Sequence, residues 1–123
     1  MSEYLKRKID KFLFDWKANP DRKPLIIKGA RQVGKTKSIE TFAAQNYESI
    51  VEINFAEDPV YKQIVENGYS AEAVIKNISR INPEARFIKG KTLIFFDEIQ
   101  EFPDIATSLK FFSLDGNYDV ICS

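Results

Sequence analysis

The sequence contains no histidine and only one cysteine, Cys122. Without histidine, the chain lacks the Ser-His-Asp and Cys-His triads, the H-E-x-x-H metalloprotease motif and the usual catalytic zinc centres. A single cysteine excludes an internal disulfide and a zinc site built from cysteines, and we expect this thiol to be unreactive within an apolar strand. The chemistry of this protein must therefore rest on other residue types.

Long hydrophobic runs are also absent, because the longest lies around residues 93–96 and a membrane span needs roughly 18 apolar residues. The N-terminal residues are polar and charged, which is unlike a secretory signal peptide. We therefore expect a cytoplasmic protein with no membrane contact. The length of 123 residues allows one domain, and 44% hydrophobic residues with ten phenylalanines can form a core, into which we place Trp16 and the phenylalanines.

Positive and negative charges balance overall but are unevenly distributed along the sequence. Residues 1–37 hold eleven Lys or Arg and four acids, and residues 38–123 hold the remaining seven basic and fourteen acidic residues. This asymmetry is typical of an anion-binding half, of a basic arm for nucleic acid, or simply of a solvated basic helix. The basic first helix has no aromatic platform for bases, so it supports nucleic-acid binding only weakly.

Hydrophobic periodicity predicts helices that alternate with short apolar strands. A helix is expected over residues 2–17, where the apolar stripe consists of Leu5, Ile9, Phe12, Leu13 and Trp16. The further elements, in chain order, are a strand at 25–27, a helix at 35–46, a strand at 50–55, short helices at 59–66 and 70–81, a strand at 92–96, a helix from about 103 and a strand at 118–122. Ser70 with Glu72 predicts the start of the second short helix, and Pro103 is expected in the first turn of the helix from about 103. This order predicts an α/β fold with a parallel sheet of about four strands between helices.

The chain ends at Ser123, immediately after the last expected strand. Because both faces of a parallel sheet need helical cover, we expect an incomplete domain that belongs to a longer protein. An incomplete sheet would leave an unpaired strand edge, which favours self-association or a partner protein.

Residues 29–36 match the pattern G-x-x-x-x-G-K-[ST] in full and lie between an apolar strand and a helix. Glycine permits the backbone to wrap closely around an anion, and successive N–H groups of residues 31–36 would face phosphate oxygens at a helix N-terminus. Lys35 could reach the β- and γ-phosphates, and the Thr36 hydroxyl could bind Mg²⁺. The full candidate loop is Gly29, Ala30, Arg31, Gln32, Val33, Gly34, Lys35 and Thr36.

A second candidate motif is the apolar strand 93–96 followed by Asp97 and Glu98. Carboxylates at the carboxyl end of a buried parallel strand emerge at the same edge of the sheet as the phosphate loop. We expect Asp97 to bind Mg²⁺ opposite Thr36, and Glu98 to orient or deprotonate an attacking water. Asn54, at the end of another strand, could bind ligand at this edge or simply form a turn.

Together these motifs resemble Walker A (residues 29–36) and Walker B (residues 93–98) of the P-loop NTPases, and the leading helix resembles the AAA+ branch. More closely, the chain is similar to prokaryotic AAA-type ATPases whose ATPase domain precedes a C-terminal domain of unknown function. This similarity rests on G-A-R-Q-V-G-K-T, I-N-F-A-E-D-P and L-I-F-F-D-E-I-Q-E-F-P-D, in that order.

The resemblance implies a three-layer fold, with an N-terminal helix and lead-in over residues 1–24 and a partial ATPase core over residues 25–123. It places the strand at 118–122 between the two Walker strands and a polar sensor near Ser123. The arginine finger, lid and fifth strand of such proteins have no counterpart here. For the complete protein it implies ATP binding and Mg²⁺-dependent ATP hydrolysis, with Lys35 and Glu98 as catalytic residues.

Two alternatives remain open at this stage. A P-loop kinase would transfer the γ-phosphate to a small molecule, although such enzymes rely on an arginine-rich lid and need no glutamate after the Walker B aspartate. A nucleotide-dependent switch that binds DNA or protein would use hydrolysis only secondarily. A GTPase is disfavoured because no N-K-x-D motif occurs in the sequence.

Overall fold

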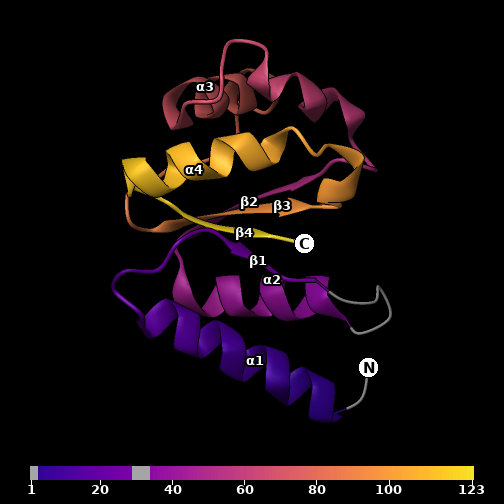
Figure 1. Ribbon diagram of the computed structural model, residues 1–123, viewed down its shortest axis with the longest axis vertical. Helices are drawn as coiled ribbons and strands as arrows, with labels where there is room; N and C mark the ends of the chain where they lie inside the picture. The colour runs from indigo at the N-terminus through magenta and orange to yellow at the C-terminus, as the bar shows by residue number, and fades with distance from the viewer. Residues whose placement is uncertain (1–2, 29–33) are drawn as a thin grey trace.

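The computed structural model describes residues 3–28 and 34–123, which fold into a parallel sheet with helices on both faces (Figure 1). Its strands are β1 (Leu25–Ile26), β2 (Ser49–Asn54), β3 (Thr92–Asp97) and β4 (Asp119–Cys122). The strand order is β1-β4-β3-β2, and every neighbouring pair is parallel. The predicted α/β class and the predicted insertion of the last strand between β1 and β3 are confirmed.

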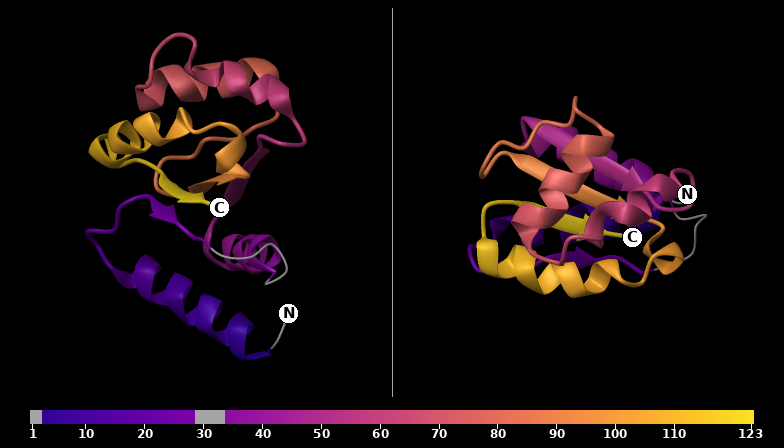
Figure 2. Two further views of the ribbon diagram at one scale, coloured as in Figure 1. Left: turned by 45° about the vertical axis from the view of Figure 1, so that its right-hand side comes forward. Right: turned by 90° about the horizontal axis from the view of Figure 1, so that it is seen from above.

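Among the described residues, five helical segments cover this sheet together with one short connecting turn. They are α1 (Glu3–Ala18), α2 (Lys35–Asn46), the 3₁₀ helix η2 (Pro59–Val65), α3 (Ala71–Ile81) and α4 (Ile105–Asp115), and the turn is the 3₁₀ helix η3 (Ile99–Glu101). Helices α1 and α2 lie on one face of the sheet, and α3 and α4 lie on the other (Figures 1 and 2). The result is the three-layer arrangement that the strand and helix order predicted.

Strand β3 is the centre of the fold because all six of its residues are buried. Its side chains alternate between the two faces, as the pleat of a strand requires. Leu93 and Phe95 pack with α1 and α2, whereas Ile94 and Phe96 pack with α3 and α4. Burial on both faces explains why this segment is a continuous apolar run in the sequence.

The predicted element boundaries lie within two residues of the observed ones, and those of α2 agree. Ser70 caps α3, as expected, by accepting a hydrogen bond from the Ala73 N–H at 3.1 Å. The segment after Pro59 is a 3₁₀ helix, and α4 begins at Ile105, so Pro103 precedes the helix and does not lie in its first turn. Proline at position 103 still fits, because it removes no helical hydrogen bond there.

Two phenylalanines of α1 contradict the expectation that this set lies in the core. Phe12 is 55% exposed and Phe14 is 71% exposed, whereas Leu13 between them is fully buried. Helix α1 packs with one narrow stripe against α2, so side chains beside that stripe stay in solvent. Cys122 is buried, and desolvation raises the pKa of its thiol to about 12, as expected for an unreactive cysteine.

None of the helices in the described part of the chain is both long enough and apolar enough to cross a membrane.

Candidate functional site

The two sequence motifs meet at the carboxyl edge of the sheet. Thr36 in the first turn of α2 donates a hydrogen bond from its hydroxyl to Asp97 Oδ2 at 3.1 Å, across 61 residues of sequence. Asp97 is the last residue of β3 and is only 7% exposed. The tertiary structure therefore brings together the threonine and the aspartate that the sequence proposed as a pair.

Only part of the candidate phosphate loop lies in the described structure. Residues 29–33, which include Arg31 and Gln32, lie outside the described residues, whereas Gly34, Lys35 and Thr36 lie within them. Gly34 immediately precedes α2 and has φ 71° and ψ 29°, a left-handed conformation that glycine adopts without strain. The need for this conformation explains the second glycine of the motif.

A cavity of about 290 Å³ lies between the start of α2 and the end of β3. Its lining residues are polar or charged in all but one case and come from both motifs and from the end of β4: Gly34, Lys35, Thr36, Asp97, Glu98, Gln100 and Ser123. We call this the polar cavity. In this cavity a lysine, which can bind anions, lies near oxygen atoms that can bind a cation. A ligand that contains both phosphate and a metal ion requires this combination.

The turn from β3 into η3 carries the second acidic residue. Glu98 has φ 55° and ψ 48° and is the one non-glycine residue with positive φ in the described ranges. Its backbone N–H donates to Asp97 Oδ1 at 2.9 Å, and the Gln100 side-chain amide donates to Glu98 Oε2. Such a conformation costs about 1–3 kcal/mol in a residue with a side chain, and it commonly marks functional sites.

Asn54 does not contribute its side chain to the polar cavity. Its Oδ1 accepts hydrogen bonds from the N–H groups of Ala56 and Glu57, both at 2.9 Å, and so forms the turn after β2. Of the two interpretations that the sequence allowed for this residue, the structure therefore supports a turn former.

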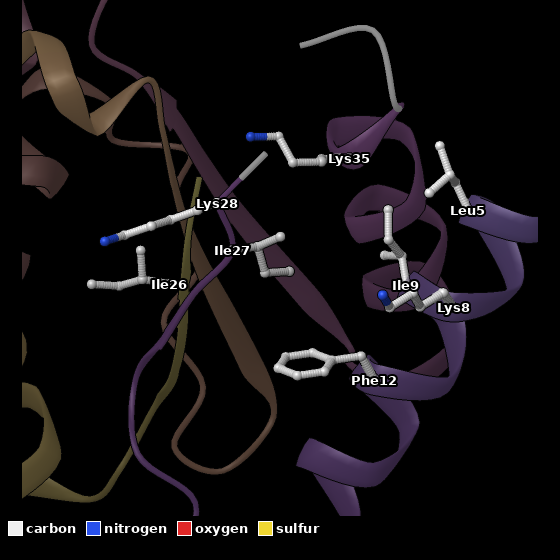
Figure 3. Close-up of a pocket in the computed structure, with 8 residues that line it drawn as sticks. All are labelled: Leu5, Lys8, Ile9, Phe12, Ile26, Ile27, Lys28 and Lys35. Atoms are coloured by element: carbon white, nitrogen blue, oxygen red, sulfur yellow. The ribbon is translucent and has the colours of Figure 1, made fainter. Parts of the chain in front are cut away.

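A second, mostly apolar cavity of about 320 Å³ adjoins the polar one. It lies between α1 and the end of β1 and is lined by Leu5, Lys8, Ile9, Phe12, Ile26, Ile27, Lys28 and Lys35. Figure 3 shows Phe12 projecting from α1 toward β1, and the Lys35 side chain turned away from Leu5. Lys35 lines both cavities, so the apolar cavity and the polar cavity are neighbours on either side of one lysine.

Gln100 and the lining of the apolar cavity, apart from Lys35, were not predicted as site residues from the sequence. Gln100 stands two positions after Glu98 in the Asp-Glu-Ile-Gln segment, but a glutamine at that spacing has no recognisable role until the left-handed turn at Glu98 is known. Nothing in the sequence indicated that Phe12 would be exposed, because it lies on the predicted apolar stripe of α1.

Whether the site could hold Mg²⁺ can be judged from its oxygen donors. Within residues 3–28 and 34–123, no group of three or more His, Cys, Asp or Glu side chains is arranged to bind a metal ion. Mg²⁺ in phosphate-binding sites usually needs only one or two protein oxygens, because water and phosphate complete its octahedron. The hydroxyl of Thr36 and the carboxylate of Asp97, already 3.1 Å apart, fit that requirement.

Carboxylates near this site also repel one another. Desolvation, a hydrogen bond with the Glu40 side chain and the negative charges of Glu40, Asp97 and Glu57 raise the pKa of Glu52 to about 7. Negative charge is therefore concentrated around Glu52 of β2, and a bound cation would reduce the repulsion among these carboxylates.

Comparison with models of known protein families gives a match. A family model described as an AAA domain matches residues 21–123. The match covers the sheet, both Walker-like motifs and the polar cavity, and it leaves α1 outside. A search of the curated proteins finds no match to the chain.

Proposed function

Because the chain belongs to this AAA-domain family and is therefore an AAA-type nucleotide-binding module, we propose that it binds ATP with Mg²⁺ and hydrolyses it. The observation that carries this proposal is the Thr36–Asp97 hydrogen bond, which joins the end of the phosphate loop to the end of β3. A glycine turn that merely connected a strand to a helix would have no reason to face a buried carboxylate.

Each residue of the polar cavity has a role that its chemistry supports. Lys35 neutralises charge on the β- and γ-phosphates, and backbone N–H groups at the start of α2 bind phosphate oxygens, aided by the helix dipole. Thr36 and Asp97 would hold Mg²⁺. When bound, Mg²⁺ offsets the negative charge on the phosphate oxygens.

Glu98 acts as the general base in this proposal. A water molecule attacks the γ-phosphorus in line with the bond to the β,γ-bridging oxygen, which breaks and leaves with ADP. The Glu98 carboxylate accepts a proton from that water, and inorganic phosphate is released. Its place in the lining of the polar cavity, one residue after Asp97, supports this role.

The apolar cavity supplies a place for the nucleobase. A flat aromatic base suits a pocket with Ile9, Phe12 and Ile27 in its wall, and the shared Lys35 lies between base and phosphates. Helix α1, which precedes the matched region, would then complete the nucleotide site of the module.

Calorimetric titration of the full chain with Mg²⁺–ATP tests binding. We expect Lys35→Ala to weaken binding by about a hundredfold or more, since it removes a charged donor to phosphate. Lys110→Ala, which removes an exposed lysine of α4, should bind as the wild type does. Equal affinity of Lys35→Ala and wild type would refute the proposed site.

Phosphate release measured on the same preparations tests hydrolysis. Glu98→Gln should bind ATP within about threefold of wild type and release phosphate about 10²–10⁴-fold more slowly, the usual contribution of a general base. Turnover at the wild-type rate in this variant would remove Glu98 from the role assigned to it.

A further inference from the structure

We infer that Gln100 is a positioning residue that holds the Glu98 carboxylate at the polar cavity. The catalytic meaning of this inference rests on the function proposed above, whereas the contact itself does not. The Gln100 side-chain amide donates to Glu98 Oε2, and both residues line the cavity together with Lys35 and Thr36.

The backbone of Glu98 makes this contact possible. Its left-handed conformation reverses the chain direction at the end of β3, so that η3 begins immediately beside the site. The Glu98 N–H donates a hydrogen bond to Asp97 Oδ1 at 2.9 Å, and this bond fixes the peptide between these two residues. A strained residue at this position is maintained by neighbours on both sides.

The donor lies on a segment that is fixed at both ends. At its start, the Ile99 N–H donates to the Ser123 carbonyl at 3.1 Å, and the Ser123 N–H donates to the Phe96 carbonyl at 2.9 Å. After its end, the Phe102 ring packs against Phe55 in the core, with ring centroids 5.0 Å apart. Gln100 therefore projects from a short helix that is anchored to β3, to the end of β4 and to the core.

A positioned carboxylate is what a general base needs, because it must lie within hydrogen-bond reach of the water that it deprotonates. A glutamate side chain can rotate about three bonds, and a hydrogen bond from a fixed donor restricts that rotation. Gln100 is neutral and keeps the carboxylate in place without adding a charge to the cavity. Loss of the donor should therefore slow the chemical step and leave nucleotide binding nearly unchanged.

The contact can be tested without any turnover by NMR of the full chain. The side-chain amide signal of Gln100, assigned by its loss in Gln100→Met, should shift in Glu98→Ala and stay in place in Glu101→Ala, which removes the next carboxylate along η3. An amide signal that ignores Glu98→Ala would overturn the inference, whether or not the protein hydrolyses ATP.

Kinetics then test what the contact does. Gln100→Met, which has a similar length but no donor, should lower kcat about tenfold and change ATP affinity by less than about twofold. Gln100→Glu should lower kcat at least as much, because it places a like charge beside Glu98. Gln45→Met on the exposed side of α2 is the matched control and should behave as wild type.

The outcomes separate the inference from the proposed function. If wild type releases no phosphate, the proposed function fails and the NMR result still decides whether Gln100 holds Glu98. If wild type is active and Gln100→Met matches Gln45→Met in kcat, the positioning role is wrong even though the proposed function stands. A raised KM with unchanged kcat would likewise contradict positioning, because it would assign Gln100 to binding.

Discussion

The two edges of the sheet both carry buried polar groups, but they use them differently. At the amino edge, the carboxylate of Asp119 at the start of β4 is 17% exposed and is surrounded by protein donors. At the carboxyl edge, Asp97 at the end of β3 is only 7% exposed, yet it faces a cavity of about 290 Å³. One carboxylate is enclosed by its partners, and the other borders space for a ligand.

The amino edge holds segments of the chain together. Arg22 Nε donates to both oxygens of Asp119 at 3.0 Å, and the Tyr47 hydroxyl donates to Oδ2 at 2.5 Å. Lys17 Nζ lies 3.7 Å from the same oxygen. The cluster thus joins the end of α1, the lead-in to β1, the end of α2 and the start of β4. Desolvation and the hydrogen bond to Asp119 raise the pKa of the Tyr47 hydroxyl far above its ordinary value.

At the carboxyl edge, one residue has a strained backbone, and side chains of opposite charge surround the polar cavity. Thr36 and Asp97 are joined by one hydrogen bond, and the backbone of Glu98 is in the left-handed conformation. The comparison teaches that burial of a charged group does not by itself identify a functional site. What distinguishes the two edges is whether protein atoms or an open cavity surround the charge.

The largest expected effect is a loss of stability caused by a substitution at the amino edge. Asp119→Asn should lower the free energy of unfolding by about 2–3 kcal/mol, since it leaves Arg22 without its charged partner in a mostly buried cluster. Denaturant titration measures this change, and calorimetry on the same sample should show nearly unchanged ATP affinity. A variant of wild-type stability that had lost ATP binding would invert the comparison.

A smaller effect of opposite sign is expected at the carboxyl edge. Glu98→Gly should raise the free energy of unfolding by about 1 kcal/mol, because glycine adopts φ 55° without the steric cost that glutamate bears. Glu101→Gly in η3 is the control and should destabilise by about 0.5–1 kcal/mol. Thermal melting of both variants checks the sign, and a destabilising Glu98→Gly would mean that Glu98 makes more interactions than its strain costs.

The smallest effect concerns the dependence of stability on pH. Because the pKa of Glu52 is raised to about 7, the folded chain binds a proton there that the unfolded chain releases at lower pH. The contribution of Glu52 to stability therefore falls as pH rises from about 4.5 to 7. Glu52→Gln should remove less than about 1 kcal/mol of that change, because solvent screens the charges around this exposed side chain. Melting temperatures between pH 5 and 8 measure it.

The control for this prediction is Glu48→Gln, an exposed acid near the start of β2 that lies 3.8 Å from Lys91. This variant should keep the pH dependence of the wild type. If both substitutions flatten the curve alike, the effect would be general charge reduction and not the pairing of Glu52 with Glu40 and Asp97.

Much of the fold could be predicted from local patterns. The apolar run 93–96 predicted the central strand, and Ser70 predicted the start of α3, because burial on two faces and helix capping leave direct traces in sequence. Exposure of Phe12 could not be predicted, since a hydrophobic stripe does not show how wide a face its neighbour will cover.

The candidate site was likewise predictable from the sequence only in part. The lysine, threonine and two acids were named from their motifs, but the contribution of Gln100 depends on the backbone angle of Glu98. The choice between the two possible roles of Asn54 required knowing where its side-chain oxygen points, which is toward the N–H groups of Ala56 and Glu57.

By itself the sequence determined which residues could bind phosphate and cation, because glycine, lysine, threonine and carboxylates carry those capacities wherever they stand. It also determined the alternation of strands and helices, since hydrophobic period is a local property. Only the tertiary structure decided that Thr36 lies 3.1 Å from Asp97, that Asp119 is enclosed and that Gln100 reaches Glu98. These are distances between elements, and they are set by the order and register in which the strands pack.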